Sequence, residues 1–467
     1  MHNELPSSTC LEGFPFDPDF PQLVLASDPA RMLAVFREHL KPAGTKPYFI
    51  EECVPFRFRI RQSTSRCVLQ YTLRVVDPDS GCHLEQWATG IIFAETGKAE
   101  QLWRDMQASE PLRDFPERWL TFEPVSFLPD LRMVVELFPY DRRLRNLRAV
   151  LDGGMAAELE PRLLARLGAG DWRTLERAFE PVRHRTELGA VLRHTLTARE
   201  RQTGRIETLR SYLKVYRGGH GAEKFRSLQA LVDRCRERRS PYSVAPPLAY
   251  CSRLDTLVLE EAPGTVLYQV LQQDVTTLAA RTVARAVVAL DQDDLETTLH
   301  HTLADQLEDV KRASSLVQWA CPQVRDEVKA ITAAVVSELL EVPPGTIHRD
   351  LKPDHVFLTE DQVVFVDMDS VARGDPARDP AHLWAHIVAQ VNLETLSRER
   401  AHAAADAFVD EYFAHVPTPW RAQFPLHCAG ALIEVAVSLF RRQVPQWREK
   451  VRATIEEARL ALGRGSS

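Results

Sequence analysis

A strand-like passage occurs twice in this chain, and its recurrence limits the fold more than any other feature. Val68–Leu73 resembles Val191–Leu196, which lies 123 positions later. A glycine-containing turn and an Ala-Glu helix start follow both copies at the same displacement. A further strand pair is shared one residue out of step, as Val134–Pro139 and Val258–Pro263. We therefore predict an internal duplication of a small β-rich unit; the alternative is a chance likeness of two antiparallel meanders.

The repeated part of the chain has the period of strands, and the remainder has the period of helices. Phe56, Phe58 and Ile60 alternate with arginines, which is typical of a half-buried strand. From Val275 onward, apolar residues recur at three- and four-residue spacing, which is typical of helices. We predict helices at Pro29–His39, Leu278–Leu290, Leu295–Ala320, Arg325–Leu340, Pro380–Gln390, Arg398–His415, Ala429–Arg442 and Trp447–Leu462.

The order of these segments predicts an α+β architecture in three parts. Residues 1–150 form an N-terminal cap built from the first copy of the repeat. Residues 151–265 form the second β-rich unit, and residues 266–467 form a helical lobe interrupted by a loop and two strands. The cap is expected to serve as a docking, substrate-shaping or homodimer surface.

Composition and charge indicate a globular protein of the cytoplasm. Of the 467 residues, 45% are hydrophobic and 26% are charged, the balance of an ordinary globular chain. A net charge of −7 argues against a nucleic-acid partner held mainly through its phosphates. We see no secretory signal and no apolar run of the roughly 18 residues that span a bilayer. We therefore expect no membrane partner. The eight cysteines include no C-x-x-C pair, so we expect reduced thiols.

The residues best suited to chemistry lie in the segment Ile347–Leu358 and at the end of the strand that follows it. The segment presents Asp350 and Lys352 between apolar strands, and Asp367 and Asp369 close the second strand. Phosphoryl transfer needs a carboxylate near the attacking hydroxyl and hard ligands that hold Mg²⁺ against nucleotide phosphates. Both requirements are met within a short stretch, so we prefer a phosphotransfer site to a polar hairpin on the surface.

The same segment resembles the protein-kinase-like superfamily, in particular its aminoglycoside phosphotransferase and choline kinase branch. His348–His355 is similar to that superfamily's catalytic loop H-[RG]-D-L-x-x-x-N. The Asp-x-Asp at Asp367 and the G-D-P-x-x-D run at Gly374–Asp379 are similar to the small-molecule branch. The resemblance implies a bilobal kinase-like fold, with residues 151–265 as nucleotide-binding small lobe and residues 266–467 as large lobe. It also implies ATP and Mg²⁺ as cofactors and a structural role for Asp379, which would brace the catalytic loop.

The resemblance assigns a role to each residue of the loop and of the second strand. Asp350 is the catalytic base, and Lys352 neutralises the transferring phosphate. His355, Asp367 and Asp369 hold the metal ion, with His355 standing where the family has asparagine. A neutral imidazole can bind a divalent ion, but Mg²⁺ prefers oxygen ligands. The departure is therefore expected either to shift the metal preference toward Mn²⁺ or to lower the activity.

The nucleotide side of the site is expected on the second β-rich unit. Lys214 lies in an apolar strand, where an unpaired charge would be costly, so we expect an ion pair with Glu223, or failing that with Glu237. The segment around Glu260 and Ala262 resembles the family's hinge, whose backbone pairs with adenine. A glycine-rich phosphate loop is missing from the sequence, because residues 185–189 contain one glycine.

Three functional hypotheses follow. The first is an ATP-dependent kinase acting on a hydroxyl of a small molecule such as a sugar, amino sugar or amino alcohol. The second is a protein Ser/Thr kinase, which the absence of Asp-Phe-Gly and Ala-Pro-Glu elements disfavours. The third is a nucleotide-binding pseudokinase scaffold, which His355 and the missing glycine loop favour.

Overall fold

The computed structural model describes residues 13–61, 65–109, 119–273, 276–295, 297–393 and 395–463. Its contacts divide the chain into two compact units. Unit 1 comprises Met1–Gly153, Arg185–Gly189 and Ser438–Glu449, and unit 2 comprises Gly154–His184, Ala190–Val437 and Lys450–Ser467. The second β-rich unit and most of the helical lobe fall in the same compact unit. The predicted boundary at residue 265 is therefore not a boundary between these units, and the three-part division stays a prediction.

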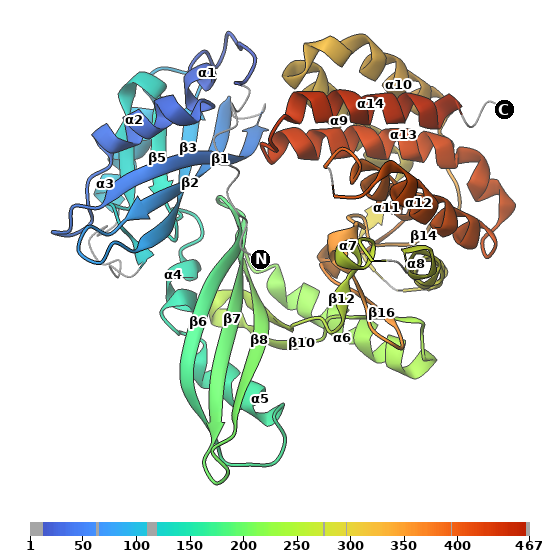
Figure 1. Cartoon of the computed structure of the whole chain (residues 1–467), viewed down its shortest axis with the longest axis horizontal. Helices are drawn as coiled ribbons and strands as arrows, with labels where there is room; N and C mark the ends of the chain where they lie inside the picture. The colour runs from blue at the N-terminus through green and yellow to red at the C-terminus, as the bar shows by residue number, and fades with distance from the viewer. Residues whose placement is uncertain are drawn as a thin grey trace. The chain divides into compact units, whose positions relative to one another are not determined.

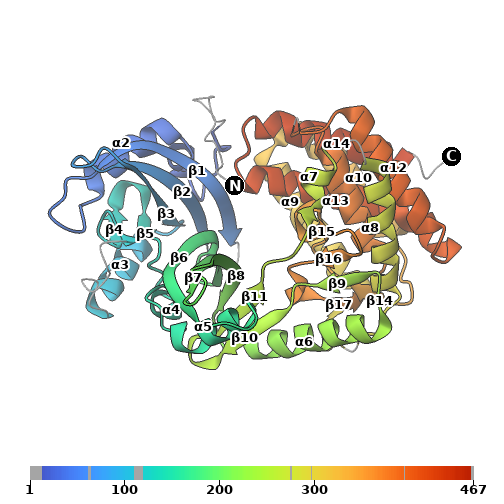
Figure 2. The ribbon, with the colours of Figure 1, turned by 60° about the horizontal axis from the view of Figure 1, so that its bottom comes forward.

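Unit 1 is built on one antiparallel five-stranded sheet with a helix on each face. The strand order is β1-β2-β3-β5-β4. Tyr71 of β2 packs its ring on Phe36 of α2, whereas Ile91 of β3 lies in an apolar cluster with Ala99 of α3. Adjacent residues of a strand point to opposite faces, so α2 and α3 cover the two sides of the sheet (Figure 2). The elements are α1 (Leu23–Ala26), α2 (Pro29–His39), β1 (Phe49–Arg61), β2 (Arg66–Val76), β3 (His83–Phe93), α3 (Lys98–Ser109), β4 (Val125–Leu128), β5 (Met133–Leu137) and α4 (Asn146–Leu151).

Unit 2 contains a second five-stranded sheet of the same topology. Its order is β10-β11-β8-β7-β6, and α6 follows β8 as α3 follows β3 (Figure 1). A short 3-10 turn joins β10 to β11 and also β4 to β5, and each turn ends on a left-handed residue, Asp255 and Arg132. These two residues are 123 positions apart, the same displacement as between the other parts of the two copies. The predicted displacement of 124 for the last strand pair is therefore one residue too long. The elements are α5 (Ala156–Ala165), β6 (Trp172–Arg185), β7 (Gly189–Glu200), β8 (Ile206–Tyr216), α6 (Gly221–Arg238), β10 (Pro247–Cys251) and β11 (Thr256–Glu260).

The shared topology supports the predicted duplication, and a common origin of the two sheets stays a prediction. Ile91 and Lys214 occupy the same place in the two sheets, since Ile91 pairs with Val134 and Lys214 pairs with Leu257. Ile91 is fully buried among apolar side chains in unit 1. The position that carries the charged lysine in unit 2 is therefore part of the core in unit 1.

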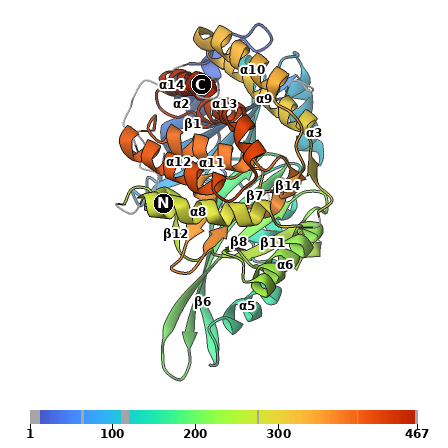
Figure 3. The same cartoon turned by 90° about the vertical axis from the view of Figure 1, so that its right-hand side faces the viewer.

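The rest of the chain is mostly helical, as the periodicity predicted. Within unit 2, α8 packs along α12, and α9 packs along α10 (Figure 3). Helix α9 begins at Leu303 and not at Leu295, because Thr302 and Asp305 form a capping box there. The helices are α7 (Leu267–Val270), α8 (Thr276–Asp291), α9 (Leu303–Ala320), α10 (Arg325–Glu338), α11 (Arg378–Ala389), α12 (Arg398–Phe413), α13 (Thr418–Arg441) and α14 (Trp447–Gly463).

Helix α13 starts at Thr418, eleven residues before the predicted start at Ala429, and continues through Pro425. In the part of the chain that the structure describes, it is the one helix long and apolar enough to cross a membrane. Most of its apolar window, 78%, is buried inside the protein, which is the pattern of a core helix.

Two small sheets hold the loops that carry the predicted chemistry. One has the order β12-β15-β16-β9, and the other has the order β13-β17-β14. The chain passes from β14 through the catalytic loop to β15, returns along β16, and reaches β17 after the Asp-x-Asp segment. The strands are β9 (Tyr242–Val244), β12 (Thr265–Val266), β13 (His300–His301), β14 (Gly345–Ile347), β15 (Val356–Leu358), β16 (Val363–Phe365) and β17 (Ala372–Gly374).

Candidate active site

The loop after β14 is fixed from beneath by a buried carboxylate. Asp379, fully buried in the first turn of α11, accepts hydrogen bonds from the backbone N–H groups of His348 and Arg349, the latter at 3.0 Å. The His348 ring contacts the carbonyl oxygen of Val366 at 2.9 Å through Nε2, which ties the loop to the Asp-x-Asp segment. The predicted bracing role of Asp379 is thereby confirmed at the level of geometry.

Asp350, Lys352 and His355 lie together on this loop. Lys352 Nζ donates to Asp350 Oδ2 at 2.7 Å, and His355 Nδ1 lies 2.9 Å from the Asp350 carbonyl oxygen. Partial burial alone would raise the pKa of Asp350, but the Lys352 ammonium outweighs it and holds that pKa well below its usual range. Burial lowers the pKa of His355 to about 3, and the Lys352 charge acts in the same direction. The imidazole is therefore neutral near pH 7, and the carboxylate is ionised.

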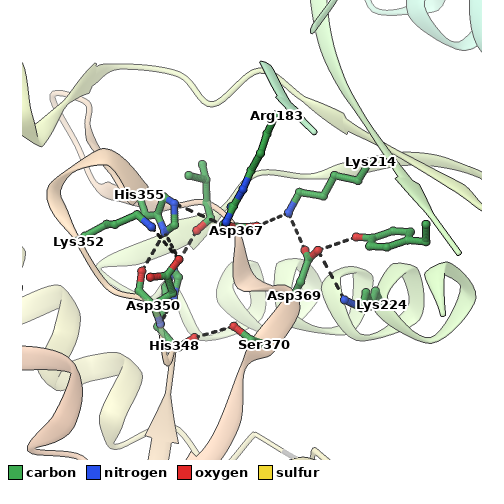
Figure 4. Close-up of polar contacts among 12 residues, drawn as sticks. Arg183, Lys214, Lys224, His348, Asp350, Lys352, His355, Asp367, Asp369 and Ser370 are labelled. Atoms are coloured by element: carbon green, nitrogen blue, oxygen red, sulfur yellow. Dashed lines mark hydrogen bonds and ion pairs between the residues drawn. The ribbon is translucent and has the colours of Figure 1, made fainter. Parts of the chain in front are cut away.

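The Asp-x-Asp segment faces Lys214 across the site (Figure 4). Lys214 Nζ donates to Asp367 Oδ1 at 2.6 Å and to Asp369 Oδ1 at 2.8 Å. Burial would lower the pKa of Lys214, but the carboxylates of Asp369 and Asp367 raise it. Asp367 has φ 61°, in the left-handed region that non-glycine residues seldom adopt, and such strain gathers at functional sites.

The predicted Lys214–Glu223 ion pair is wrong. Glu223 is exposed, and its carboxylate accepts a hydrogen bond from Thr298 Oγ1 at 3.3 Å. The neighbouring residue on α6, Lys224, faces the site and places Nζ 3.8 Å from Asp369 Oδ2. Successive side chains of a helix point about 100° apart. An error of one residue in the predicted facing position therefore replaces the anion Glu223 with the cation Lys224.

Three residues of the site were missed by sequence reasoning. Lys224 also lies with Nζ 4.8 Å from the centroid of the Tyr216 ring, and the Tyr216 hydroxyl donates to Asp369 Oδ2 at 2.6 Å. Arg183 of β6 places Nη1 3.9 Å from Asp367 Oδ2. The signal for Tyr216 was its position two residues after Lys214, which puts both on one face of β8; the other two had no local signal.

The donor atoms of the site fit a divalent metal ion. Ligand atoms of Asp350, His355 and Asp367 all lie within 4.8 Å of one another. His355 Nδ1 faces a carbonyl oxygen, so this nitrogen carries the proton and Nε2 is left with a lone pair, 3.7 Å from Asp367 Oδ2. Two carboxylates and a neutral imidazole suit Mn²⁺ at least as well as Mg²⁺. The predicted ligand Asp369 lies outside this triad, and its oxygens contact Lys214 and Tyr216.

The predicted hinge follows β11. The Glu260 N–H donates to the carbonyl oxygen of Pro246 at 3.0 Å, and its carboxylate lies 2.8 Å from Arg166 Nη2. Gly264 turns the chain away with φ 92°, and a Cβ atom there would lie 2.2 Å from the backbone oxygen of Leu358. Only glycine fits so close an approach. Backbone pairing of Glu260 and Ala262 with adenine stays a prediction.

Comparison with known families agrees with this arrangement. Residues 196–419, just under half of the chain, match a family described as the phosphotransferase enzyme family. This segment is similar to that family. The matched segment contains Lys214, the catalytic loop and the Asp-x-Asp. Comparison with curated proteins gave no match.

Solved structures with a likeness to the chain include kinases and phosphotransferases. A choline/ethanolamine kinase family protein from Mesorhizobium loti is 13% identical, with 66% of this chain and 95% of that chain covered and a TM-score of 0.40. An ethanolamine kinase from Plasmodium vivax is 9% identical, with coverages of 69% and 95% and a TM-score of 0.41. Aminoglycoside phosphotransferase APH(3'')-Id from Streptomyces rimosus is 18% identical, with coverages of 58% and 97% and a TM-score of 0.37.

Proposed function

We propose that this phosphotransferase uses ATP and transfers the γ-phosphate to a hydroxyl group of a small molecule, a sugar, amino sugar or amino alcohol. The observation that carries the proposal is the meeting of Lys214 with three groups, Asp350, His355 and Asp367, from a segment more than 130 residues later in the chain. Lys214 lies 2.6 Å from Asp367, which in turn lies 3.7 Å from His355, whose ring contacts the backbone of Asp350. A surface hairpin would not bring these groups together.

The chemistry of the chain's own residues follows from their charges. Asp350 is an ionised carboxylate at pH 7, so it can orient the acceptor hydroxyl and take its proton as the oxygen attacks phosphorus. Lys352 lies 2.7 Å from that carboxylate and can compensate negative charge on the phosphoryl group that is being transferred. Lys214 can hold the phosphates of the nucleotide.

Asp367, His355 and Asp350 or Asp369 would hold a divalent ion. When bound, such an ion neutralises charge on the nucleotide phosphates. Asp367 and Asp369 are engaged by Lys214, and Asp369 by Tyr216, in the present arrangement. The same carboxylates are thus held at fixed positions by the chain itself.

The proposal is tested by ATP turnover with Mg²⁺ or Mn²⁺ alone and then with sugars, amino sugars, amino alcohols and a generic protein acceptor. Turnover that depends on a small hydroxyl compound supports it. Transfer to the protein acceptor alone would favour a protein Ser/Thr kinase, and the absence of any transfer with intact nucleotide binding would favour a pseudokinase.

The base is tested separately with Asp350→Ala. The substitution is expected to abolish transfer and to leave nucleotide binding unchanged, because the carboxylate acts on the acceptor hydroxyl. Calorimetric binding of ATP and an acceptor-dependent assay measure the two effects. Transfer that persists would show that another group is the base.

A further inference from the structure

The turn between β6 and β7 offers little to a phosphate. A phosphate loop binds its ligand through free backbone N–H groups, usually of glycines. Here the Glu187 N–H donates to Asp141 Oδ2 at 2.7 Å, and the Leu188 N–H donates to the carbonyl oxygen of Arg185 at 2.8 Å. The turn belongs to unit 1, and its Glu187 carboxylate is bound by Arg66 and Arg142 of the same unit. The charge of the nucleotide phosphates must therefore be met by other groups.

Cationic side chains gather on the Asp-x-Asp segment (Figure 4). Lys214 contacts both carboxylates, Lys224 lies 3.8 Å from Asp369, and Arg183 lies 3.9 Å from Asp367. The side chain of Lys214 is 11% exposed, whereas those of Lys224 and Arg183 are 30% and 39% exposed. The two outer cations thus reach the solvent side of the carboxylates, and the inner one lies beneath.

The position of Lys224 needs an anion. It lies in the first turn of α6, at the positive end of the helix dipole, where a cation is unfavourable. The carboxylate of Asp369 is one such anion, but its negative charge is shared, because it also accepts hydrogen bonds from Lys214 and Tyr216. Tyr216 holds the Lys224 ammonium near its ring face and so keeps the cation in the site.

From this arrangement we infer that Lys224 and Arg183 bind the nucleotide phosphates together with Lys214, as a cationic cradle that replaces the glycine-rich loop. The inference rests on the proposed function and assigns two binding residues that the family's motifs do not include. The cradle recognises phosphate charge and not the base, so its contribution grows with the number of phosphates. It is formed by side chains from β6, β8 and α6, all within unit 2.

The test is calorimetric binding of adenosine, ADP and ATP, first in EDTA and then with Mn²⁺, to the whole protein and its variants. Lys224→Met is expected to weaken ATP binding about tenfold or more, ADP binding less, and adenosine binding not at all. Arg183→Met is expected to lose affinity in the same order, most for ATP, less for ADP and not at all for adenosine. Lys224→Arg is expected to keep most of the ATP affinity. Arg226→Met is the matched control, since it removes one exposed positive charge from another face of α6.

Two results would overturn the inference while the proposed function stands. One is an unchanged ATP affinity in both Lys224→Met and Arg183→Met. The other is an equal loss for adenosine and ATP, which would indicate damage to the base site and not to phosphate binding. Failure of the unchanged protein to bind ATP would instead overturn the proposed function, and the cradle with it.

Discussion

Replacing Asp379 by alanine should loosen the catalytic loop from a distance. The carboxylate is fully buried and accepts hydrogen bonds from the backbone N–H groups of His348 and Arg349. Alanine provides no acceptor, so the buried N–H group of His348 and the half-buried N–H group of Arg349 would lose their partner. The loop would then be free to move Asp350, although the substituted side chain never touches a substrate.

The size of the effect follows from these two bonds. Each buried donor left unsatisfied costs about 1–3 kcal/mol, so the gross loss is roughly 2–6 kcal/mol. We therefore expect Asp379→Ala to destabilise the protein by roughly 2–6 kcal/mol.

Urea unfolding and amide hydrogen exchange measure the global and the local effect of Asp379→Ala. The amides of His348 and Arg349 should exchange at least about tenfold faster in the variant. Asp305→Ala is the control, since Asp305 also accepts two hydrogen bonds, both from Thr302, but is exposed at the start of α9. Equal losses of stability in the two variants, with unchanged exchange at His348, would refute the reasoning.

Two further predictions concern other charged groups. His355→Asn should keep or improve activity with Mg²⁺ and reduce any preference for Mn²⁺, because an amide oxygen replaces a nitrogen ligand; complete loss in a metal-dependence assay would contradict this. Arg66→Met should cost unit 1 about 3 kcal/mol in urea unfolding, since it leaves the buried Glu187 carboxylate with fewer cations, while Arg104→Met, in an exposed pair, should change little. Burial would raise the pKa of Glu187, but Arg66 and Arg142 lower it below 4.5, so this stabilisation is present above pH 4.5. The difference in unfolding free energy between Arg66→Met and the unchanged protein should shrink as the pH falls below 4.5. A difference that stays constant with pH would contradict the role of the ionised Glu187 carboxylate.

The order of elements could be predicted because it depends on local periodicity. Helix Pro29–His39 has the bounds that the sequence indicated, and the strand with Lys214 and the helix after it also lie where the pattern placed them. Element ends were less accurate. Leu295 lies before α9, because the capping box of Thr302 and Asp305, and not apolar spacing, decides where that helix starts. Helix α13 begins at Thr418, eleven residues before the predicted start.

The catalytic loop and the Asp-x-Asp could be assigned from sequence because the residues of each lie close together in the chain. Their spacing fixes Asp350, Lys352 and His355 on one turn and Asp367 at the end of one strand. The brace provided by Asp379 was also within reach, since it opens the next helix. In these cases only a few residues separate the functional side chains along the chain, so the backbone limits how far apart they can lie.

The partners of Lys214 were decided by the tertiary structure alone. Whether Glu223 or Lys224 faces the site depends on the rotation of α6 about its axis, which packing against other strands sets and no local pattern reveals. Arg183 comes from a strand that precedes the motif by more than 150 residues, so its approach to Asp367 is a property of the folded chain. Sequence determined which groups carry the chemistry, and the packing of strands and helices determined which charges surround them.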